Sequence, residues 1–357
     1  MARKHRVGLI GLGGIAQNAH MEAYTKMENV EIAAVCDVLP QRIEEFRTRF
    51  SMPDVAGFTD FRDLLQVENL DFVDICTPNY LHAEIAMAAL KRGLHVFCEK
   101  PDAVSAEEAR KMMDTAKKQN RVLMVMRNNR YLETSEYLKR YIDDGKMGEI
   151  YAARCGWQRR RGIPGKGGWF TTKAESGGGP LIDLGVHMID LTMWLMGNPR
   201  PVSVSGCIYK KFADTKAVDS VHAAFGTARE DGIMDVEDLA MGFIRFANGA
   251  CLQIEFSWAS NIEKEQRFLE LRGSRAGAAW SSLDDRLKIF GEEYGQTVDY
   301  LPRIQNERSA HKANIAHFVD VVTKGEKPMF VPQQGVDMMG ILEGLYRSAE
   351  EGREILL

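Results

Sequence analysis

Hydrophobic and polar positions along the first third of the chain follow a regular alternation of short apolar runs and amphipathic stretches. The apolar runs predict strands at 6–10, 30–36, 70–76, 94–98 and 121–126, and the amphipathic stretches predict helices at 15–27, 41–50, 60–66, 80–92 and 105–120. Strands that alternate with helices predict a parallel, doubly wound sheet. Ligands of such a sheet bind beyond the carboxyl ends of its strands.

The pattern changes after Met126, where a helix at 132–143 precedes a region rich in strands. Strands are predicted at 149–160, 201–211, 218–226, 239–246, 250–258, 267–273 and 287–291, and closing helices at 310–323 and 334–350. We therefore divide the chain into a first domain at 1–126 and a second α/β domain at 127–357. The sequence shows neither an internal repeat nor a low-complexity tract.

The clearest pair of strands in the second domain surrounds Asn248-Gly249, a strong hairpin signal. Its predicted register places one apolar set on the first face: Met241, Phe243, Leu252, Ile254, Phe256 and Trp258. That face requires a cover of helices. The other face carries Ile244, Phe246, Cys251, Gln253 and Glu255 and, being half apolar, could pair with another subunit.

The first predicted strand runs into Gly11-Leu-Gly13-Gly14-Ile15-Ala16, a G-x-G-x-x-A sequence before a helix. Such glycines allow a tight turn and a close approach of the backbone to a pyrophosphate at the helix N-terminus. Asp37 ends the second strand, where a carboxylate accepts hydrogen bonds from adenosine ribose hydroxyls and repels a 2′-phosphate. The alternative for Asp37 is a helix N-cap. The pattern favours NAD, with NADP possible because Arg42 could bind the 2′-phosphate.

The stretch Ser176–Trp194 combines three glycines, Pro180 and a helix that is apolar nearly all round. Such a helix should be buried. Asp183, His187 and Asp190 lie on one stripe of it, at i, i+4 and i+7. An ionisable stripe in a buried helix is either a satisfied polar seam or the wall of a catalytic cleft.

Composition excludes several classes of protein. The chain has 357 residues, 45% of them hydrophobic and 27% charged, as expected of a globular protein of about two domains. A net charge of −4 argues against nucleic acid as a partner. No apolar run reaches the roughly 18 residues of a membrane span. The basic, then apolar N-terminus could be mistaken for a signal peptide, but its apolar part is short and broken by glycines.

The six cysteines form no Cys-x-x-Cys pair and no regular framework, which favours a reduced, cytoplasmic protein. Cys36, Cys76 and Cys98 lie near three strand ends. Because they lack the spacing of histidine or carboxylate ligands, we expect small buried hydrophobic residues and no metal.

Four motifs together resemble the glucose–fructose oxidoreductase, inositol dehydrogenase and MocA-like family (Gfo/Idh/MocA) over nearly the whole chain. They are the glycine sequence 11–16, Thr77-Pro78-Asn79 with His82, Glu99-Lys100-Pro101, and residues 177–187 with Asp183 and His187. The resemblance implies an N-terminal Rossmann domain and a C-terminal α/β domain with an open, mostly antiparallel sheet. It also implies NAD(P)-dependent oxidation or reduction of sugars, polyols or related alcohols by a homo-dimer or homo-tetramer.

The resemblance also assigns site residues. It places Lys100 at the nicotinamide and the substrate, and Asp183 and His187 at the family's Asp-x-x-x-His positions. The residues at cofactor positions are Gly11, Gly13, Gly14, Ile15, Asp37, Thr77, Pro78, Asn79, His82 and Glu99, together with Lys100. His187 has a suitable ordinary pKa for the base, and Lys100 can stabilise the reacting oxygen or relay its proton. The alternative for Lys100 is a surface lysine before a proline.

Two features depart from the family's general pattern. Asp102 stands where an apolar residue is usual, directly after Lys100-Pro101. The strand from Trp157 to Arg161 and the glycine-rich loop before Trp169 are not general to the family. We expect Arg159 or Arg161, with Trp169, to contact an acidic or multiply hydroxylated part of the substrate. The alternative is that these arginines are solvated or lie in an oligomer contact.

Three functions remain open from the sequence. The first is a sugar or polyol dehydrogenase or reductase. The second is a glycoside hydrolase or lyase that uses NAD transiently, without net NADH formation. The third is a cofactor-binding regulator without catalysis, which would tolerate loss of Lys100 or His187.

Overall fold

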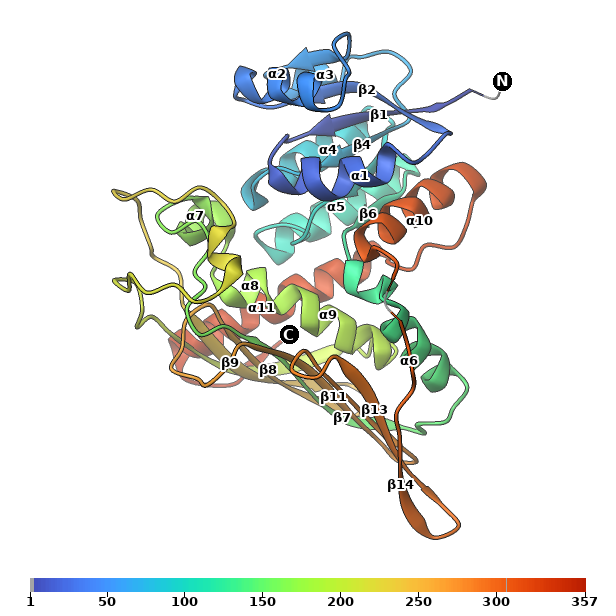
Figure 1. Ribbon diagram of the computed structural model, residues 1–357, viewed down its shortest axis with the longest axis vertical. Helices are drawn as coiled ribbons and strands as arrows, with labels where there is room; N and C mark the ends of the chain where they lie inside the picture. Colours follow the sequence, from blue (N-terminus) through green and yellow to red (C-terminus); the bar gives the residue numbers. More distant parts are fainter. Residues whose placement is uncertain (1–2, 306) are drawn as a thin grey trace. The chain divides into compact units, whose positions relative to one another are not determined.

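The computed structural model describes residues 3–305 and 307–357, and the chain forms two compact units (Figure 1). Unit 1 comprises Met1–Asn128 and Arg308–Val336, and unit 2 comprises Asn129–Glu307 and Asp337–Leu357. This division differs from the predicted one in two respects. The first boundary lies after Asn128 and not after residue 126. The segment Arg308–Val336, which the sequence analysis assigned to the second domain, belongs to unit 1.

Unit 1 is built on a six-stranded parallel sheet in the order β3-β2-β1-β4-β5-β6. The strands are β1 (His5–Ile10), β2 (Val30–Cys36), β3 (Ala56–Phe58), β4 (Phe72–Ile75), β5 (His95–Cys98) and β6 (Leu123–Val125). The crossover helices are α2 (Pro40–Arg49), α3 (Phe61–Leu64), α4 (His82–Lys91) and α5 (Ala106–Gln119). The doubly wound prediction is confirmed, although the short β3 was not predicted. Every residue of β4 is buried, as expected for a strand covered on both faces.

The contacts of helix α10 (Ala310–Lys324) explain why the segment Arg308–Val336 belongs to unit 1. The helix packs on the π-helical turn η1 (Ala16–His20), on α1 (Met21–Tyr24) and on β5. The ring of Phe318 lies 5.3 Å from that of Phe72 and 5.1 Å from that of Phe97, between ring centroids. All three rings are fully buried, so α10 completes the core on one face of the parallel sheet.

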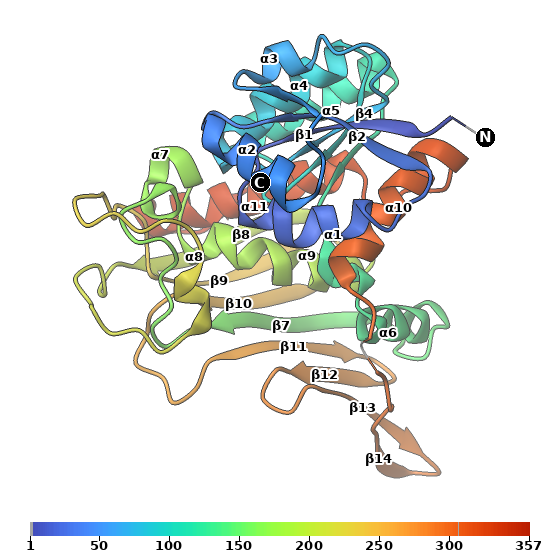
Figure 2. The same cartoon turned by 45° about the horizontal axis from the view of Figure 1, so that its top comes forward.

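Unit 2 is built on a nine-stranded sheet in the order β14-β13-β12-β11-β7-β10-β9-β8-β15 (Figure 2). The strands are β7 (Ile150–Gln158), β8 (Pro201–Tyr209), β9 (Leu239–Phe246), β10 (Cys251–Ser257), β11 (Gln266–Gly273), β12 (Gly277–Ser281), β13 (Arg286–Glu293), β14 (Gln296–Tyr300) and β15 (Ile355–Leu356). All neighbours pair antiparallel except β10 and β7, which are parallel. The predicted fold class is confirmed.

Helices cover one face of this sheet, chiefly α8 (Pro180–Asp183), α9 (Gly185–Leu195) and α11 (Pro332–Glu351) (Figure 1). The other helices of unit 2 are α6 (Glu133–Asp143) and α7 (Lys173–Ser176). Ten of the eleven residues of α9 are buried, as its apolar sequence predicts. Asp190 of α9 forms a bidentate ion pair with the buried Arg130, with contacts of 2.8 and 2.6 Å. Of the three residues in the predicted polar stripe, Asp190 therefore has a structural role, because its carboxylate is paired with Arg130.

The β9–β10 hairpin has a different register from the predicted one. Phe246 pairs with Ala250 and Arg245 with Cys251, so the loop is the three residues 247–249 with Gly249 at φ +86°. A three-residue loop that ends in a left-handed glycine shifts the pairing by one residue from a two-residue turn. The buried face consequently carries Ala240, Ile244, Phe246, Leu252, Ile254 and Phe256, and the open face carries Met241, Phe243, Arg245, Cys251, Gln253 and Glu255. Ile244 and Phe246 lie in the core, and Met241 and Phe243 lie on the open face, so the β9 residues of both predicted faces were wrong.

The strand predicted at 218–226 is also wrong. Ser220 accepts a hydrogen bond from the His222 backbone and starts a 3-10 turn, η5 (Val221–Ala224), within a long connection between β8 and β9. A serine that bonds to the backbone two residues on favours a turn over a strand.

Among the described residues, no helix combines the length and the apolarity that crossing a membrane requires.

Candidate active site

The glycine sequence after β1 forms a turn that only glycine can make at its first position. Gly11 has φ +89°, and a Cβ there would lie 2.6 Å from the Cys76 carbonyl oxygen. At Gly13, by contrast, an added Cβ would meet no described atom within 4 Å. The loop is thus tightly packed where it leaves the sheet and open where it enters η1. This is the geometry required for backbone N–H groups to approach a pyrophosphate.

Asp37, directly after β2, ties this loop to the next one. Its Oδ2 accepts from the Leu12 N–H at 2.9 Å, and its Oδ1 accepts from the Leu39 N–H at 3.0 Å, just before α2. Arg42 Nη1 lies 3.4 Å from the same carboxylate. Asp37 therefore links Leu12 to Leu39, but the alternative role as N-cap is wrong, because the N-cap of α2 is Leu39 and no side chain caps the helix there. Asp37 stands at the strand end where a ribose is bound in dinucleotide folds.

Thr77 to His82 follow β4 at the same edge of the sheet. The Thr77 hydroxyl is buried and has no hydrogen-bond partner within residues 3–305 and 307–357. His82 is fully buried, with Nε2 at 3.0 Å from the Thr77 carbonyl and Nδ1 at 2.8 Å from the Pro101 carbonyl. Burial lowers the pKa of His82. His82 therefore joins the Thr77-Pro78-Asn79 turn to the Glu99-Lys100-Pro101 segment, and Asn79 is buried within that turn.

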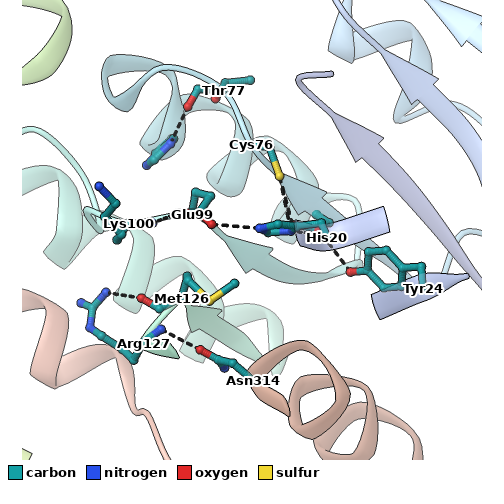
Figure 3. Close-up of polar contacts among 11 residues, drawn as sticks. His20, Tyr24, Cys76, Thr77, Glu99, Lys100, Met126, Arg127 and Asn314 are labelled. Atoms are coloured by element: carbon teal, nitrogen blue, oxygen red, sulfur yellow. Dashed lines mark hydrogen bonds and ion pairs between the residues drawn. The ribbon is translucent and has the colours of Figure 1, made fainter. Parts of the chain in front are cut away.

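Lys100 follows β5, and the Lys100–Pro101 peptide bond is cis. Its backbone N–H donates to Glu99 Oε2 at 3.1 Å. The unusual Asp102 is 3% exposed and forms an ion pair with the buried Arg127. Arg127 in turn donates its backbone N–H to Asn314 Oδ1 at 2.7 Å (Figure 3). The acidic residue that departs from the family pattern thus anchors the segment behind Lys100.

Asp183 and His187 lie in unit 2, at the junction of two helices. The single helix predicted over this stretch is interrupted at Leu184, so Asp183 ends α8 and His187 lies in the first turn of α9. Trp258 donates from Nε1 to Asp183 Oδ2 at 3.0 Å. The His187 ring lies 6.2 Å from the Trp157 ring. Trp258, directly after β10, therefore fixes Asp183, and Trp157 of β7 lies beside the proposed base.

Glu237 anchors the glycine turn that leads into α8, and sequence reasoning missed it. Its carboxylate accepts from the Gly179 N–H at 3.0 Å, the Leu181 N–H at 3.1 Å and the Tyr346 hydroxyl at 2.9 Å. Burial raises the pKa of Glu237, and these donors oppose that effect. No local motif marks Glu237, because its partners are more than 50 residues away in the chain.

A polar cluster surrounds Trp157 on β7. Arg159 and Arg267 each place a guanidinium carbon 5.0 Å from the centroid of the Trp157 ring. His222 meets that ring edge-on at 5.5 Å, and its Nε2 lies 3.3 Å from Glu265. Arg159 is 3% exposed, and its Nε has no acceptor in the part of the chain that the structure describes. Burial lowers the pKa of Arg159, whereas Asp183 and Glu265 raise it.

The other predicted substrate residues have different surroundings. Arg161 donates to the carbonyls of Arg160 at 2.6 Å and Ser260 at 2.8 Å, and to Asn261 Oδ1 at 2.7 Å. This guanidinium therefore holds two loops together. Trp169 stacks on Phe170, with ring centroids 3.9 Å apart.

The structure thus places the predicted residues in two groups. The cofactor candidates and Lys100 lie at the carboxyl edge of the parallel sheet in unit 1. The open backbone at Gly13 and the unpartnered Thr77 hydroxyl fit a dinucleotide. Asp183, His187 and Arg159 gather around Trp157 and Trp258 in unit 2. Sequence reasoning missed Trp258, Glu237, His222 and Arg267, which lack a local signal.

Two family matches cover most of the chain. Residues 5–127 match the family described as "Oxidoreductase family, NAD-binding Rossmann fold", and residues 135–293 match the GFO/IDH/MocA C-terminal domain. A D-glucoside 3-dehydrogenase of Escherichia coli (strain K12) is 33% identical over 99% of this chain and 97% of its own length. A levoglucosan dehydrogenase of Pseudarthrobacter phenanthrenivorans is 32% identical over 77% of this chain and 73% of its own. A solved structure of a levoglucosan dehydrogenase in complex with NADH superposes with a TM-score of 0.85 and 25% identity, covering 99% of both chains.

Proposed function

Because the chain belongs to the GFO/IDH/MocA family of oxidoreductases, with an NAD-binding Rossmann domain, we propose that it transfers a hydride between NAD and a secondary alcohol of a neutral sugar or glycoside. The two curated relatives are named for a glucoside and for levoglucosan, an anhydrosugar. Their names support a carbohydrate substrate of this kind.

The observation that carries the proposal is the arrangement around Asp183. This carboxylate is fixed by Trp258 one turn before His187, and a buried guanidinium, Arg159, is held over the neighbouring Trp157 ring. His187 is the base that takes the hydroxyl proton, and Asp183 orients His187 or binds a neighbouring hydroxyl. Lys100 donates to the reacting oxygen as negative charge develops on it.

The charges in unit 2 favour a neutral, hydroxylated substrate over an acidic one. The guanidiniums of Arg159 and Arg267 are balanced by the carboxylates of Asp183 and Glu265, which raise the pKa of the arginine beside them. Burial, Arg159 and Arg267 lower the pKa of His222, which favours its neutral form. A cluster without net charge offers donors and acceptors for hydroxyl groups and no strong field for an anion.

In unit 1, the N–H groups of the Gly13–Ile15 turn would bind the pyrophosphate of NAD. Asp37 would bind the adenosine ribose, and Thr77, Asn79 and Glu99 would lie along the remainder of the cofactor. NAD bound there would supply the acceptor for the hydride that leaves the alcohol carbon. Asp37, held by the Leu12 and Leu39 backbones, favours NAD over NADP because it repels a 2′-phosphate.

A substrate screen tests this function. Glucosides, free sugars, anhydrosugars, polyols and uronic acids are incubated with NAD, and both NADH absorbance and the products are measured. We expect NADH and a keto-sugar from a neutral glycoside, and much weaker turnover of the uronic acids. Cleavage of a glycoside without net NADH would support the hydrolase or lyase instead. Binding of NAD without turnover of any sugar would support the regulator.

We also propose a homo-oligomer that uses the open face of the nine-stranded sheet. Ile244 and Phe246 cannot form this contact, because both are buried in the core. The open face instead presents Met241, at 36% exposure, beside Phe243, and Phe290 at 40% exposure. Light scattering that returned twice or four times the monomer mass would support this proposal, and a monomer would contradict it.

All six cysteines are free thiols, which supports a reducing, cytoplasmic location.

A further inference from the structure

His20 is a buried histidine to which the proposed function gives no role. It is the last residue of η1, the helical turn that follows the glycine loop, and its side chain is fully buried. Its ring lies 6.0 Å from that of Phe97 on β5. His20 therefore connects the element that starts at the cofactor loop with the strand that ends at Glu99 and Lys100.

Both ring nitrogens of His20 face carboxylate oxygens. Nδ1 lies 2.7 Å from Asp74 Oδ2, and Nε2 lies 2.9 Å from Glu99 Oε1. A neutral imidazole has one N–H and would turn a lone pair toward one of these carboxylates, whereas an imidazolium donates to both. Burial lowers the pKa of His20, but Asp74 and Cys76 outweigh burial and raise it well above its ordinary value. The geometry and the electrostatics agree on a buried cation.

Glu99 divides its two oxygens between His20 and Lys100. Oε1 accepts from His20, and Oε2 accepts the backbone N–H of Lys100 at 3.1 Å (Figure 3). Burial on its own would raise the pKa of Glu99, but the hydrogen bond and charge of His20, together with Lys100, lower it to about 2. Figure 3 shows the Glu99 side chain directed toward the His20 ring. The charge of Glu99 therefore depends on the charge of His20.

We propose that His20 is a positioning residue for Lys100, a buried imidazolium that keeps Glu99 ionised and directed at the Lys100 backbone. The inference rests on the proposed role of Lys100 at the reacting oxygen. Without the cation, Glu99 would be a buried carboxylate with a single backbone donor from Lys100, and burial would favour its protonation. A protonated Glu99 would no longer fix the Lys100 backbone or place a negative charge beside its ammonium group.

The other titratable groups around this pair fit the assignment. Burial lowers the pKa of His82, which also interacts with Glu99, and raises the pKa of the Cys98 thiol, so both are neutral. Tyr24, on α1, donates to Asp74 Oδ2 at 2.9 Å, which orients the second carboxylate. The Cys76 thiol has its pKa raised to about 12, chiefly by burial, and is neutral. His311, on α10, has its pKa lowered by burial and by the positive charges of His20 and Lys100. His20 is therefore the imidazole in this group that carries the positive charge.

A metal ion is the competing occupant of the same residues. His20, Asp74 and Cys76 each bring one ligand atom within 4.8 Å of the others. A metal on Nδ1 would require that nitrogen to lose its proton, while the imidazolium carries protons on both nitrogens. The protonation state of the ring therefore separates the two alternatives.

The first experiment uses the unmodified protein with NAD and needs no variant to fold. The ring nitrogens of its eight histidines are labelled with 15N, and their chemical shifts are followed from pH 6 to 9 by NMR. We expect one ring to keep both nitrogens protonated at pH 9. If all eight rings are neutral at that pH, or if one carries a metal, the proposal is overturned.

The second experiment compares His20→Gln, His20→Lys and the control His95→Gln in the pH profile of kcat. His95 begins β5, the strand that ends just before Glu99 and Lys100, and therefore lies at the opposite end of β5 from Lys100. Its Nδ1 accepts a hydrogen bond from the Val122 N–H at 3.0 Å. In His20→Gln the acidic limb should move up by about one pH unit or more, because Glu99 now binds a proton in the measured range. His20→Lys restores a cation and should return the limb to its original position. His95→Gln should leave the limb unmoved.

The outcomes separate this inference from the proposed function. A folded His20→Gln protein with an unshifted profile overturns the positioning role, even if Lys100→Ala is inactive. An equal shift in His20→Gln and His20→Lys also overturns it, because charge would then not be the cause. An active Lys100→Ala protein removes the proposed role of Lys100 instead, whatever the His20 variants show.

Discussion

Trp258 Nε1 donates a hydrogen bond to Asp183 Oδ2 across 3.0 Å. Trp258 is fully buried just after β10, and its backbone N–H in turn donates to the Asp238 carbonyl at 2.9 Å. The indole is therefore fixed by the sheet, and through it the sheet fixes the carboxylate that precedes His187 by one turn.

Trp258→Phe tests this relationship, because it keeps an aromatic ring in the core and removes the donor. We expect kcat/KM to fall about tenfold, the effect of losing one hydrogen bond to a charged group. Asp183→Asn should cost more, because it also removes the charge beside His187. Steady-state kinetics with the substrate from the screen measure both. An unchanged Trp258→Phe enzyme would mean that the indole does not hold Asp183 for catalysis.

Lys100→Ala and His187→Ala should each lose turnover while they keep the fold and the affinity for NAD. General acid–base groups contribute roughly 10²–10⁴-fold, and we expect losses of kcat in that range. Calorimetric titration with NAD and circular dichroism provide the controls. Weaker NAD binding without a loss of kcat in Lys100→Ala would make Lys100 a cofactor residue and not a catalytic one.

Asp37 should set the preference for NAD over NADP. Asp37→Asn removes the charge that repels a 2′-phosphate and keeps an oxygen near the Leu12 and Leu39 N–H groups. We expect the ratio of kcat/KM values, NAD over NADP, to fall about tenfold or more. Arg42→Ala is the matched control for the 3.4 Å ion pair, and it should weaken whatever NADP activity exists. A clear NADP preference that Asp37→Asn leaves unchanged would contradict the role of Asp37.

The order of strands and helices in unit 1 could be predicted because each element shows its own local pattern. The strand ends with Asp37, Thr77 and Glu99 followed from that order. The sequence did not predict β3, because that strand has only three residues. It also did not predict β12, because Gly277–Ala279, which begin that strand, have little preference for strands. The hairpin at Asn248 was predicted with the wrong register, since the dipeptide does not reveal whether two or three residues form the loop.

The residues of the candidate site likewise fall into those that the sequence could predict and those that it could not. Lys100, Asp183 and His187 were predictable because they lie in contiguous motifs. Trp258, Glu237 and His20 were not, because each acts through a partner far away in the chain: 75 residues separate Trp258 from Asp183, and 79 separate His20 from Glu99. Tertiary hydrogen bonds between buried groups leave no periodic signal in a sequence.

The buried Glu99 should make unit 1 sensitive to acid. In the folded protein its pKa is about 2, against an ordinary value of 4.5. Below pH 4.5 the unfolded chain binds this proton and the folded chain does not, so stability falls as the pH falls toward 2. The loss from this one group approaches about 1.4 kcal/mol for each pH unit in that window. Urea unfolding at several pH values measures the slope.

Glu99→Gln should flatten that slope, because its amide does not titrate. Glu107→Gln is the control, since Glu107 is a fully exposed carboxylate on α5 and should leave the slope nearly unchanged. Equal slopes in the wild-type and Glu99→Gln proteins would show that Glu99 does not carry this pH dependence.

Arg159 and Arg161 provide a matched pair for the substrate contact, since both follow the same strand and differ in their surroundings. The Arg159 guanidinium is buried over Trp157, with Nη1 on the Gly162 carbonyl at 3.1 Å, whereas Arg161 bonds to Ser260 and Asn261. A substrate hydroxyl that accepts from Arg159 does so in the ground state and the transition state alike. Arg159→Ala should therefore raise KM about tenfold with little change in kcat. Arg161→Ala should lower the melting temperature and leave KM unchanged. Similar KM values in Arg159→Ala and the wild-type enzyme would leave Arg159 a structural residue, and a rise in KM confined to Arg161→Ala would reverse the assignment.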